Sequence, residues 1–317
     1  MTAKIEPSAI QRNEQDRIKL GTITFLEKYR GLQVEQYTSK VGNPRYYNIE
    51  GYQGDFPSVT SITGIVNKPR LPDWYKRKGI EKAISLMAEP TMINECQSVA
   101  NEKNDRAKKH NAKQPKVRWN DQHTWQTIFY DKAKSGPQDA IDYATGFGDD
   151  SHDLIQSLAY EDMGRPAPNF ARSMVSVAQT PIAEGFEAWL RDSDIEIVAS
   201  ELMVFHPAYR YAGTIDLVGM RKRDPLGMVV IDLKTGGVFD EAAMQISAYA
   251  EALDYLTMPG WHADEALVLQ LPRERPDEWD ADKLYEVHKV NSIPACHDAF
   301  ISAMNLQQRL NEETWIK

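Results

Sequence analysis

The sequence contains few cysteines. Among its 317 residues only Cys96 and Cys296 occur, and they lie far apart in the chain. Two cysteines exclude the disulfide framework of a small secreted protein. They also exclude an iron–sulfur cluster held by four thiolates of one chain. We therefore expect two structural thiols and no iron–sulfur cluster.

Long hydrophobic runs are also lacking. No stretch approaches the ~18 consecutive apolar residues that a membrane helix requires, although 42% of all residues are apolar. The first residues carry Glu6, Glu14 and Asp16 without an apolar core, unlike a secretion signal or an organelle presequence. We expect a protein that does not bind membranes and that stays in the cytoplasm.

Positive charge is in deficit. Lys and Arg number 37 and Asp and Glu number 46, so the net charge is −9, which argues against a simple nucleic-acid coating protein. Between Asn101 and Arg118, however, seven basic residues stand against two acidic ones, a local charge of +5. In this basic insertion we expect Lys108, Lys109, Lys113 and Lys116 to bind a nucleic-acid backbone. The alternative is a solvated surface loop.

The chain shows no internal repeat and no low-complexity tract that would divide it. Helical periodicity predicts a mainly helical N-terminal region over residues 1–145, with the basic insertion at about 101–118 inside it. Residues 146–317 are predicted to form the core domain.

The core domain is predicted to belong to the α/β class. Two helices precede three strands between Ile195 and Lys234, and a further helix, two strands and a closing helix follow. The second and third strands should form an antiparallel hairpin through a turn at Arg221 to Gly227, where Asp-Pro and Gly supply turn chemistry. This order of elements predicts a central mixed β-sheet flanked by helices.

Two of these strands place charged side chains on one face. In the third strand, the alternation of side chains sends Asp232 and Lys234 to one face and their apolar neighbours to the other. On the second strand Asp216 shares the polar face, so the two carboxylates should come within reach of one small cation. The alternative is a solvated outer face, where an Asp232–Lys234 pair contributes ~0–1 kcal/mol. The dense apolar run from Gly227 to Leu233 favours a covered strand, where charge is costly unless it binds something.

Residues outside the hairpin extend this pattern. The helix after the third strand carries Gln245 and Tyr249 four positions apart, on one helical face. Upstream, Gly148 and His152 begin a predicted helix whose N-terminus can bring an imidazole to the same site. Glu201, on the first strand, is either a further acid of the site or a structural residue, because the sequence does not set the strand register.

In chain order these residues form a series of motifs. The series is Gly148-x-x-x-His152, Gly213-Thr214-Ile215-Asp216, Ile231-Asp232-Leu233-Lys234-Thr235-Gly236 and Gln245-x-x-x-Tyr249. It resembles the RecB-like exonuclease branch of the PD-(D/E)XK nuclease superfamily. The segment Pro57-Ser58-Val59-Thr60, with the following Lys68-Pro69-x-Leu71-x-x-Trp74, is similar to part of the phage and mitochondrial genome maintenance exonucleases of this branch. The chain has no Gly-x-x-x-x-Gly-Lys-Ser/Thr phosphate loop, so no helicase motor is expected.

The resemblance implies a restriction-endonuclease-like core with a metal-dependent activity. The implied catalytic residues are Asp216, Asp232, Lys234, Gln245 and Tyr249. The implied ligands of Mg²⁺ or Mn²⁺ are His152, Asp216, Asp232 and the backbone carbonyl of Leu233.

The residues and the resemblance together lead us to expect a metal-dependent nuclease, and the branch that the motifs resemble implies a DNA exonuclease. It would hydrolyse phosphodiester bonds at single-stranded or frayed DNA ends in recombination, replication or repair, with the N-terminal region guiding the DNA. Two alternatives remain: a structure-specific or restriction-like endonuclease on the same core, and a DNA-binding subunit without catalysis. The expected partners are DNA ends and recombination or replication proteins, in the cytoplasm of a bacterial or phage-infected cell.

Overall fold

The computed structural model divides the chain into two compact units. The described residues are 34–38, 45–66, 71–87, 91–109, 129–167, 176–222, 224–257, 261–273 and 284–312. One unit spans residues 68–147, and the other contains the residues on either side of it. The boundary at residue 147 lies close to the expected one at 145. The N-terminal part differs from the expectation, because residues 34–66 belong with the core and not with the helical unit.

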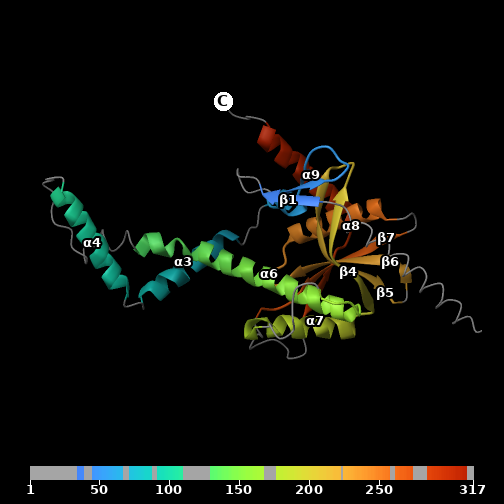
Figure 1. Cartoon of the computed structure of the whole chain (residues 1–317), viewed down its shortest axis with the longest axis horizontal. Helices are drawn as coiled ribbons and strands as arrows, with labels where there is room; N and C mark the ends of the chain where they lie inside the picture. Colours follow the sequence, from blue (N-terminus) through green and yellow to red (C-terminus); the bar gives the residue numbers. More distant parts are fainter. Residues whose placement is uncertain are drawn as a thin grey trace, which may run out of the picture. The chain divides into compact units, whose positions relative to one another are not determined.

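A five-stranded mixed sheet forms the centre of the larger unit (Figure 1). Its strands, in order across the sheet, are β4 (Ile195–His206), β5 (Tyr211–Arg221), β6 (Asp224–Lys234), β7 (His262–Gln270) and β8 (Glu286–Lys289). β6 and β7 are parallel, and the other neighbours are antiparallel. The helix between β6 and β7, α8 (Asp240–Leu256), supplies the crossover that parallel strands need. The predicted α/β class with a mixed sheet flanked by helices is confirmed.

The hairpin of β5 and β6 forms with a tighter turn than predicted. β6 begins at Asp224, and Arg221 pairs with Asp224, so the expected turn from Arg221 to Gly227 is wrong. Proline is compatible with the first residues of a strand because its missing N–H is not needed there. The pairing of β5 with β6 therefore extends further toward the turn than predicted, and it places Leu217 opposite Ile231.

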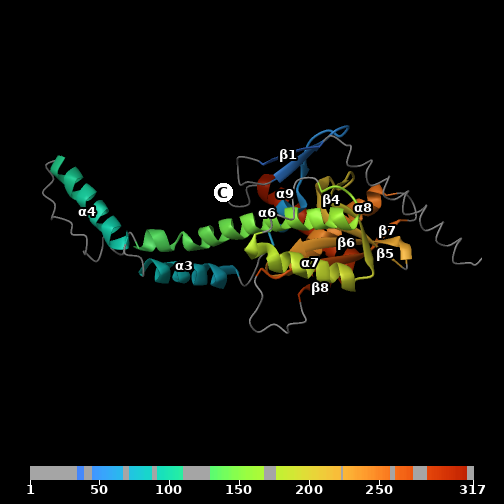
Figure 2. The same cartoon turned by 60° about the horizontal axis from the view of Figure 1, so that its bottom comes forward.

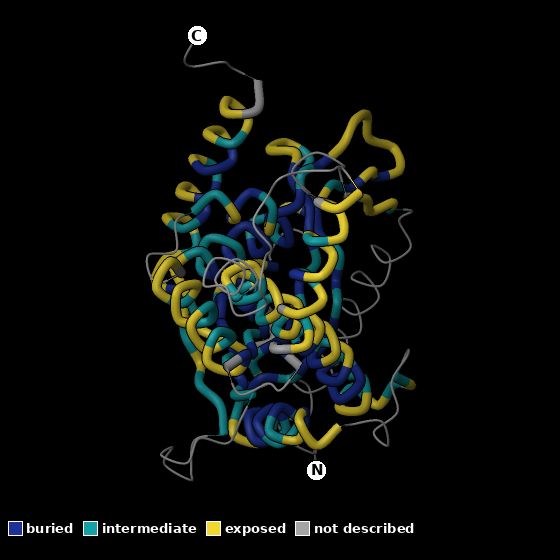
Figure 3. Tube along the Cα trace, turned by 90° about the vertical axis from the view of Figure 1, so that its left-hand side faces the viewer, coloured by how far each residue is buried: buried dark blue, intermediate teal, exposed yellow. Residues whose placement is uncertain are grey.

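Helices cover both faces of the sheet. α8 packs on β4 to β7 and against α9 (Ile293–Glu312). On the other side of the sheet lies α7 (Thr180–Asp192), as Figures 1 and 2 show. The buried residues run along the strands and the helix sides that face them (Figure 3). None of the described helices is both long and apolar enough to cross a lipid bilayer.

The first described segment adds a small antiparallel sheet to the larger unit. Its strands are β1 (Val34–Thr38), β2 (Arg45–Ile49) and β3 (Phe56–Pro57), and α2 (Val59–Thr63) follows. An isolated parallel bridge between Ser58 and Ala212 joins this segment to β5. The first described segment of the N-terminal region is therefore not helical but forms strands, which pair with one another and are joined to the core by this bridge.

The smaller unit is helical. It contains α3 (Leu71–Met87), α4 (Thr91–Lys109) and the first half of α6 (Gly136–Asp162). α6 starts earlier than predicted and runs through Gly146 and Gly148, so His152 lies within the helix and not at its N-terminus. Each glycine in a helix interior costs ~1 kcal/mol relative to alanine, which is why the sequence pattern favoured a later start.

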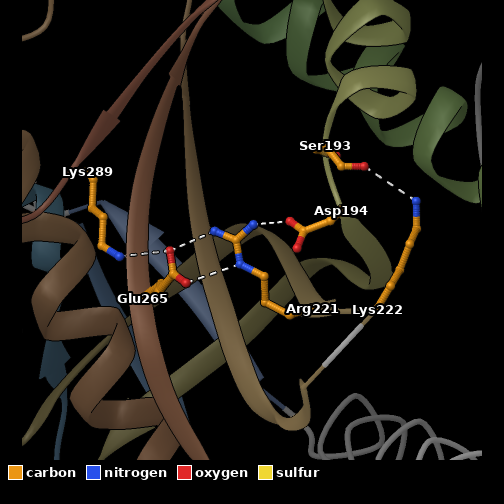
Figure 4. A network of polar contacts seen from close by, with 6 residues as sticks. All are labelled: Ser193, Asp194, Arg221, Lys222, Glu265 and Lys289. Atoms are coloured by element: carbon orange, nitrogen blue, oxygen red, sulfur yellow. Dashed lines mark hydrogen bonds and ion pairs between the residues drawn. The ribbon is translucent and has the colours of Figure 1, made fainter.

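A chain of ion pairs joins four strands at one end of the sheet (Figure 4). Arg221, at the end of β5, pairs with Asp194, which precedes β4, and lies 2.8 Å from Glu265 on β7. Lys289, on β8, lies 3.1 Å from the same Glu265 carboxylate. Shared partners hold these partly exposed side chains in one geometry, so the network stabilises this end of the sheet more than isolated pairs would.

Two histidines are buried between β4 and α9. His206, which ends β4, and His297, on α9, are 7% and 6% exposed. His206 Nδ1 accepts a hydrogen bond from the backbone N–H of Tyr209 at 3.1 Å, and His297 Nε2 lies 3.1 Å from the Tyr211 hydroxyl. Burial and the neighbouring His297 lower the pKa of His206 to about 4, and burial also lowers the pKa of His297. Both imidazoles are therefore neutral at pH 7.

Acid is expected to destabilise the protein through His206. Its pKa in the folded state, about 4, lies below the unfolded value of about 6.5. Its stabilising contribution is therefore complete above pH ~6.5 and is lost as the pH falls through about 4. His206→Asn retains an acceptor for the Tyr209 N–H but does not titrate. Between pH 7 and pH 4 we expect this variant to lose ~2–3 kcal/mol less free energy of unfolding than the wild type, measured by urea unfolding.

The control is His288→Asn, which removes a half-exposed imidazole on β8 and should follow the wild type. Equal losses in the wild type and in His206→Asn would contradict the prediction.

Candidate metal centre

Three neighbouring strands each carry a carboxylate at facing positions. The carboxylates are Glu201 on β4, Asp216 on β5 and Asp232 on β6. In the register of the sheet, Ser200 pairs with Leu217, and Leu217 pairs with Ile231. One position further along each pair, Glu201 therefore lies opposite Asp216, and Asp216 lies opposite Asp232. Asp216 and Asp232 therefore face each other across the hairpin, as their alternation predicted.

Asp216 takes the place of a backbone acceptor in the ladder between β5 and β6. Its Oδ2 accepts a hydrogen bond from the backbone N–H of Leu233 at 2.6 Å. The N–H and C=O of one strand residue point toward the same neighbouring strand, so the Leu233 carbonyl is turned toward β5 as well. The carbonyl expected to bind a metal thus lies on the same side as Asp216.

Asp232 is 2% exposed, and two side chains compensate its charge. Lys234 Nζ lies 2.6 Å from one carboxylate oxygen, and Gln245 Nε2 donates a hydrogen bond to the other at 2.9 Å. The Gln245 amide also donates to the Tyr249 hydroxyl at 3.4 Å. Burial raises the pKa of Asp232 to about 6, although Lys234 acts against it. Burial would lower the pKa of Lys234, but Asp232 and Asp216 raise it above its usual value.

His152 approaches two of the carboxylates from α6. Its Nδ1 lies 3.4 Å from an Asp216 oxygen and 3.7 Å from a Glu201 oxygen. One donor atom from each of these three residues lies within 4.8 Å of the other two, a spacing that lets one ion bind all three. Burial would lower the pKa of His152, but Asp216 and Glu201 raise it to about 11. His152 is therefore protonated at pH 7, and a divalent cation that binds there would replace this proton.

Glu201 has an unusual backbone conformation. Its φ is 50°, and Arg210 is the one other non-glycine residue in the described part of the chain with a positive φ. This conformation costs ~1–2 kcal/mol and persists where the surrounding structure holds it, often at functional sites. Burial raises the pKa of Glu201, although His152 acts against it. The structure thus places Glu201, whose role the sequence left open, in the group of three side chains that could hold a metal ion.

The donor set of His152, Glu201 and Asp216 fits a hard divalent cation. Carboxylate and carbonyl oxygens suit Mg²⁺ and Mn²⁺, and an imidazole nitrogen favours Mn²⁺. Asp232, also expected as a ligand, lies outside this three-residue group, and its two oxygens face Lys234 and Gln245.

These side chains line a pocket of about 670 Å³. The expected residues in its lining are His152, Asp216, Asp232, Lys234, Gln245 and Tyr249. The lining residues that the sequence did not identify include Asp149, Asp153 and Gln156 of α6 and Gln36, Arg45, Tyr47, Ser58 and Thr60 of the N-terminal segment. Asp149 and Gln156 lie three before and four after His152, and Asp153 lies four after Asp149, so helical periodicity would have found them. Of the N-terminal ones, Ser58 and Thr60 lie in the Pro57-Ser58-Val59-Thr60 motif that the sequence singled out, whereas no local signal marks Gln36, Arg45 and Tyr47.

The basic insertion begins inside a regular helix. Lys108 and Lys109 lie in the last turn of α4, in the smaller unit, and Lys108 is 3.5 Å from Asp105. Lys113 and Lys116 lie outside the described residues. The binding of DNA by these four lysines stays a prediction.

Gly213 allows Tyr249 to approach the sheet. A Cβ at position 213 would lie 2.5 Å from Tyr249 Cε1, closer than packed atoms tolerate. We expect Gly213→Ala to displace Tyr249 from Gln245 and to lower the free energy of unfolding by ~1–3 kcal/mol, measured by urea unfolding. The loss should shrink in a Tyr249→Leu background, because the ring that the new methyl group meets is gone.

Gly146→Ala, in α6, is the matched control. Its Cβ meets no atom within 4 Å, so the substitution should raise the stability by ~0.5–1 kcal/mol. The steric explanation fails if Gly213→Ala costs the same with and without the Tyr249 ring.

Comparison of the sequence with protein-family models and with curated proteins finds no match in either case. The argument for a function therefore depends on the geometry of this pocket.

Proposed function

We propose that the chain is a metal-dependent DNA exonuclease with a PD-(D/E)XK core of the RecB-like type. The observation that carries this proposal is the convergence of His152, Glu201 and Asp216 beside the paired Asp232 and Lys234 in one pocket. These side chains come from one helix and three adjacent strands. Their chemistry suits the hydrolysis of a phosphodiester.

Phosphodiester hydrolysis requires positive charge near the attacking water, the transition state and the leaving oxygen. A bound Mg²⁺ or Mn²⁺ supplies this charge and acidifies its water. His152, Glu201 and Asp216 would hold the ion, and the Leu233 carbonyl, on the same side of β6 as Asp216, would add an oxygen ligand.

Lys234 would act as a fixed cation. Its raised pKa keeps the ammonium protonated at pH 7, and Asp232 holds it at 2.6 Å. A compact ammonium can orient a water molecule and offset the charge that develops on the phosphorus oxygens. Gln245 and Tyr249 support this arrangement because they fix the carboxylate of Asp232.

The proposed substrates are single-stranded or frayed DNA ends. A pocket of about 670 Å³ lies within the usual range of small-ligand sites, which favours a strand end over the interior of a duplex. Such ends arise in recombination, replication and repair, so proteins of these processes are the proposed partners. The proposed location is the cytoplasm of a bacterial or phage-infected cell.

Asp216→Asn tests the metal site and should leave the fold intact. The amide oxygen can still accept the Leu233 N–H, but the side chain no longer holds a cation as a carboxylate does. We expect the turnover of end-labelled single-stranded DNA in Mn²⁺ to fall at least ~10²-fold, more than the loss of a group outside the ligand shell would cause. The unfolding curve should stay close to that of the wild type.

Asp162→Asn, at an exposed acid that ends α6, is the matched control and should keep the wild-type rate. Wild-type turnover of Asp216→Asn at saturating Mn²⁺ would refute the metal assignment. Nicking of supercoiled circular DNA would favour the endonuclease. Binding of DNA without cleavage in Mg²⁺ or Mn²⁺ would favour the non-catalytic subunit.

Lys234→Arg tests the ammonium. The guanidinium keeps the charge, but its larger planar fork does not fit where a compact cation lies 2.6 Å from Asp232. We expect turnover to fall ~10²–10³-fold with little change in Mn²⁺ affinity, measured by calorimetry. Lys222→Arg, at an exposed lysine, is the control. A wild-type turnover rate for Lys234→Arg would contradict the proposed role of the ammonium.

A further inference from the structure

The small N-terminal sheet presents one polar face to the pocket. Arg45 and Tyr47 lie two positions apart on β2, so their side chains share a face, and Gln36 on β1 pairs directly with Tyr47. All three line the pocket that also contains Asp216 and Lys234. The pocket therefore has a wall that the central sheet does not supply.

Arg45 is the cation of this wall. Lys234, which also lines the pocket, is paired with Asp232 at 2.6 Å. Arg45 is exposed, and no carboxylate of the described residues lies within 4.0 Å of its guanidinium. The α6 side of the pocket carries the acids Asp149 and Asp153. An anionic strand that enters beside these acids needs a fixed positive charge, and the guanidinium of Arg45 provides it.

Hydroxyl donors lie on the same wall. Ser58 occupies the N-cap position of α2 without a side-chain cap bond, and its Oγ lies 2.7 Å from Thr60 Oγ1. The bond between two hydroxyls uses one of their two hydrogens, so one donor remains for a ligand. Tyr47 is 4% exposed, and its hydroxyl forms no hydrogen bond with another described residue. Arginine and hydroxyl donors without a carboxylate are the groups that bind phosphate oxygens.

The wall is attached to the strand that carries Asp216. Ser58 forms a parallel bridge with Ala212 on β5, four residues before Asp216. The Ser58 N–H donates to the Arg45 carbonyl at 2.9 Å, and the Arg45 N–H donates to Ser61 Oγ at 2.9 Å. The backbone of Arg45 is thus fixed relative to β5.

We propose that Arg45, Tyr47 and the Ser58–Thr60 hydroxyl pair form a phosphate seat for the substrate strand. The seat holds a phosphodiester that flanks the one being cleaved. This inference rests on the proposed function and specifies its substrate: a strand with at least one phosphate beside the scissile one, bound independently of base sequence. Arg45 is a positioning residue in this scheme, because it contacts the strand and not the reacting atoms.

Binding of a fluorescein-labelled oligothymidylate, followed by anisotropy in Ca²⁺ over a range of salt concentrations, tests the seat. Arg45→Gln is expected to raise Kd roughly tenfold. It should also flatten the dependence of log Kd on log salt by ~0.7, because one phosphate contact of a single strand is lost. Arg45→Lys keeps the charge and should retain the wild-type slope with weaker binding. In Mn²⁺, Arg45→Gln should raise KM more than it lowers kcat.

A labelled dinucleotide with a single phosphodiester distinguishes a flanking seat from the scissile position. It lacks a flanking phosphate, so the wild type should bind it more weakly than the longer strand. Arg45→Gln should reduce the difference in affinity between the dinucleotide and the longer strand. An equal loss of affinity for both ligands would overturn the flanking position of the seat.

Arg191→Gln, at an exposed arginine of α7, is the matched control and should change neither Kd nor slope. Tyr47→Phe and Ser58→Ala remove neutral donors, so each should raise Kd without changing the slope. Unchanged Kd and slope in Arg45→Gln would overturn the seat even if the wild type cleaves DNA. The expected effects of Arg45 in Ca²⁺ without any cleavage in Mg²⁺ or Mn²⁺ would overturn the proposed nuclease and support the seat as a DNA-binding site.

Discussion

The buried charge of Asp232 governs the arrangement of the pocket. A carboxylate that is 2% exposed is costly unless surrounding groups compensate it, and Lys234 and Gln245 do so. Lys234 comes from the same strand, whereas Gln245 comes from α8, whose buried face is rich in alanine. Gly213 lets the Tyr249 ring of α8 lie close against β5, beside the Gln245 amide. The hairpin and the crossover helix therefore meet at one carboxylate.

Beside the ion pair of Asp232 and Lys234 lies a cluster in which one protonated imidazole partly offsets the charge of two carboxylates. His152 is an imidazolium between Glu201 and Asp216, and Glu201 is held in a left-handed conformation that strand pairing alone does not favour. Exchange of that proton for a divalent cation would raise the positive charge of the cluster from +1 to +2, which matches the two carboxylates, and would make the strained acid a ligand. In the proposed scheme, Arg45 would give an acidic protein of net charge −9 a local positive charge that holds an anionic strand.

The positions of the paired acids followed from local periodicity. Strand alternation leaves one polar face for Asp216, Asp232 and Lys234, and helical spacing puts Gln245 and Tyr249 on one side of the next helix. These patterns involve residues within a few positions of one another, so they could be recognised without coordinates. The mixed sheet was predictable for the same reason, since a helix between two strands favours a parallel crossover.

Other features required the tertiary structure. The side chain of Glu201 could not be assigned to the site from strand alternation alone, because the register of β4 against β5, with its irregularity between Ile197 and Ala199, is set by the folded sheet. α6 continues through Gly146 and Gly148, against their helix propensity, which moves His152 from a helix end to its interior. The wall with Arg45 exists because Ser58 pairs with Ala212, more than a hundred residues away. Contacts between distant segments depend on how the whole chain packs, and local sequence periodicity carries no information about them.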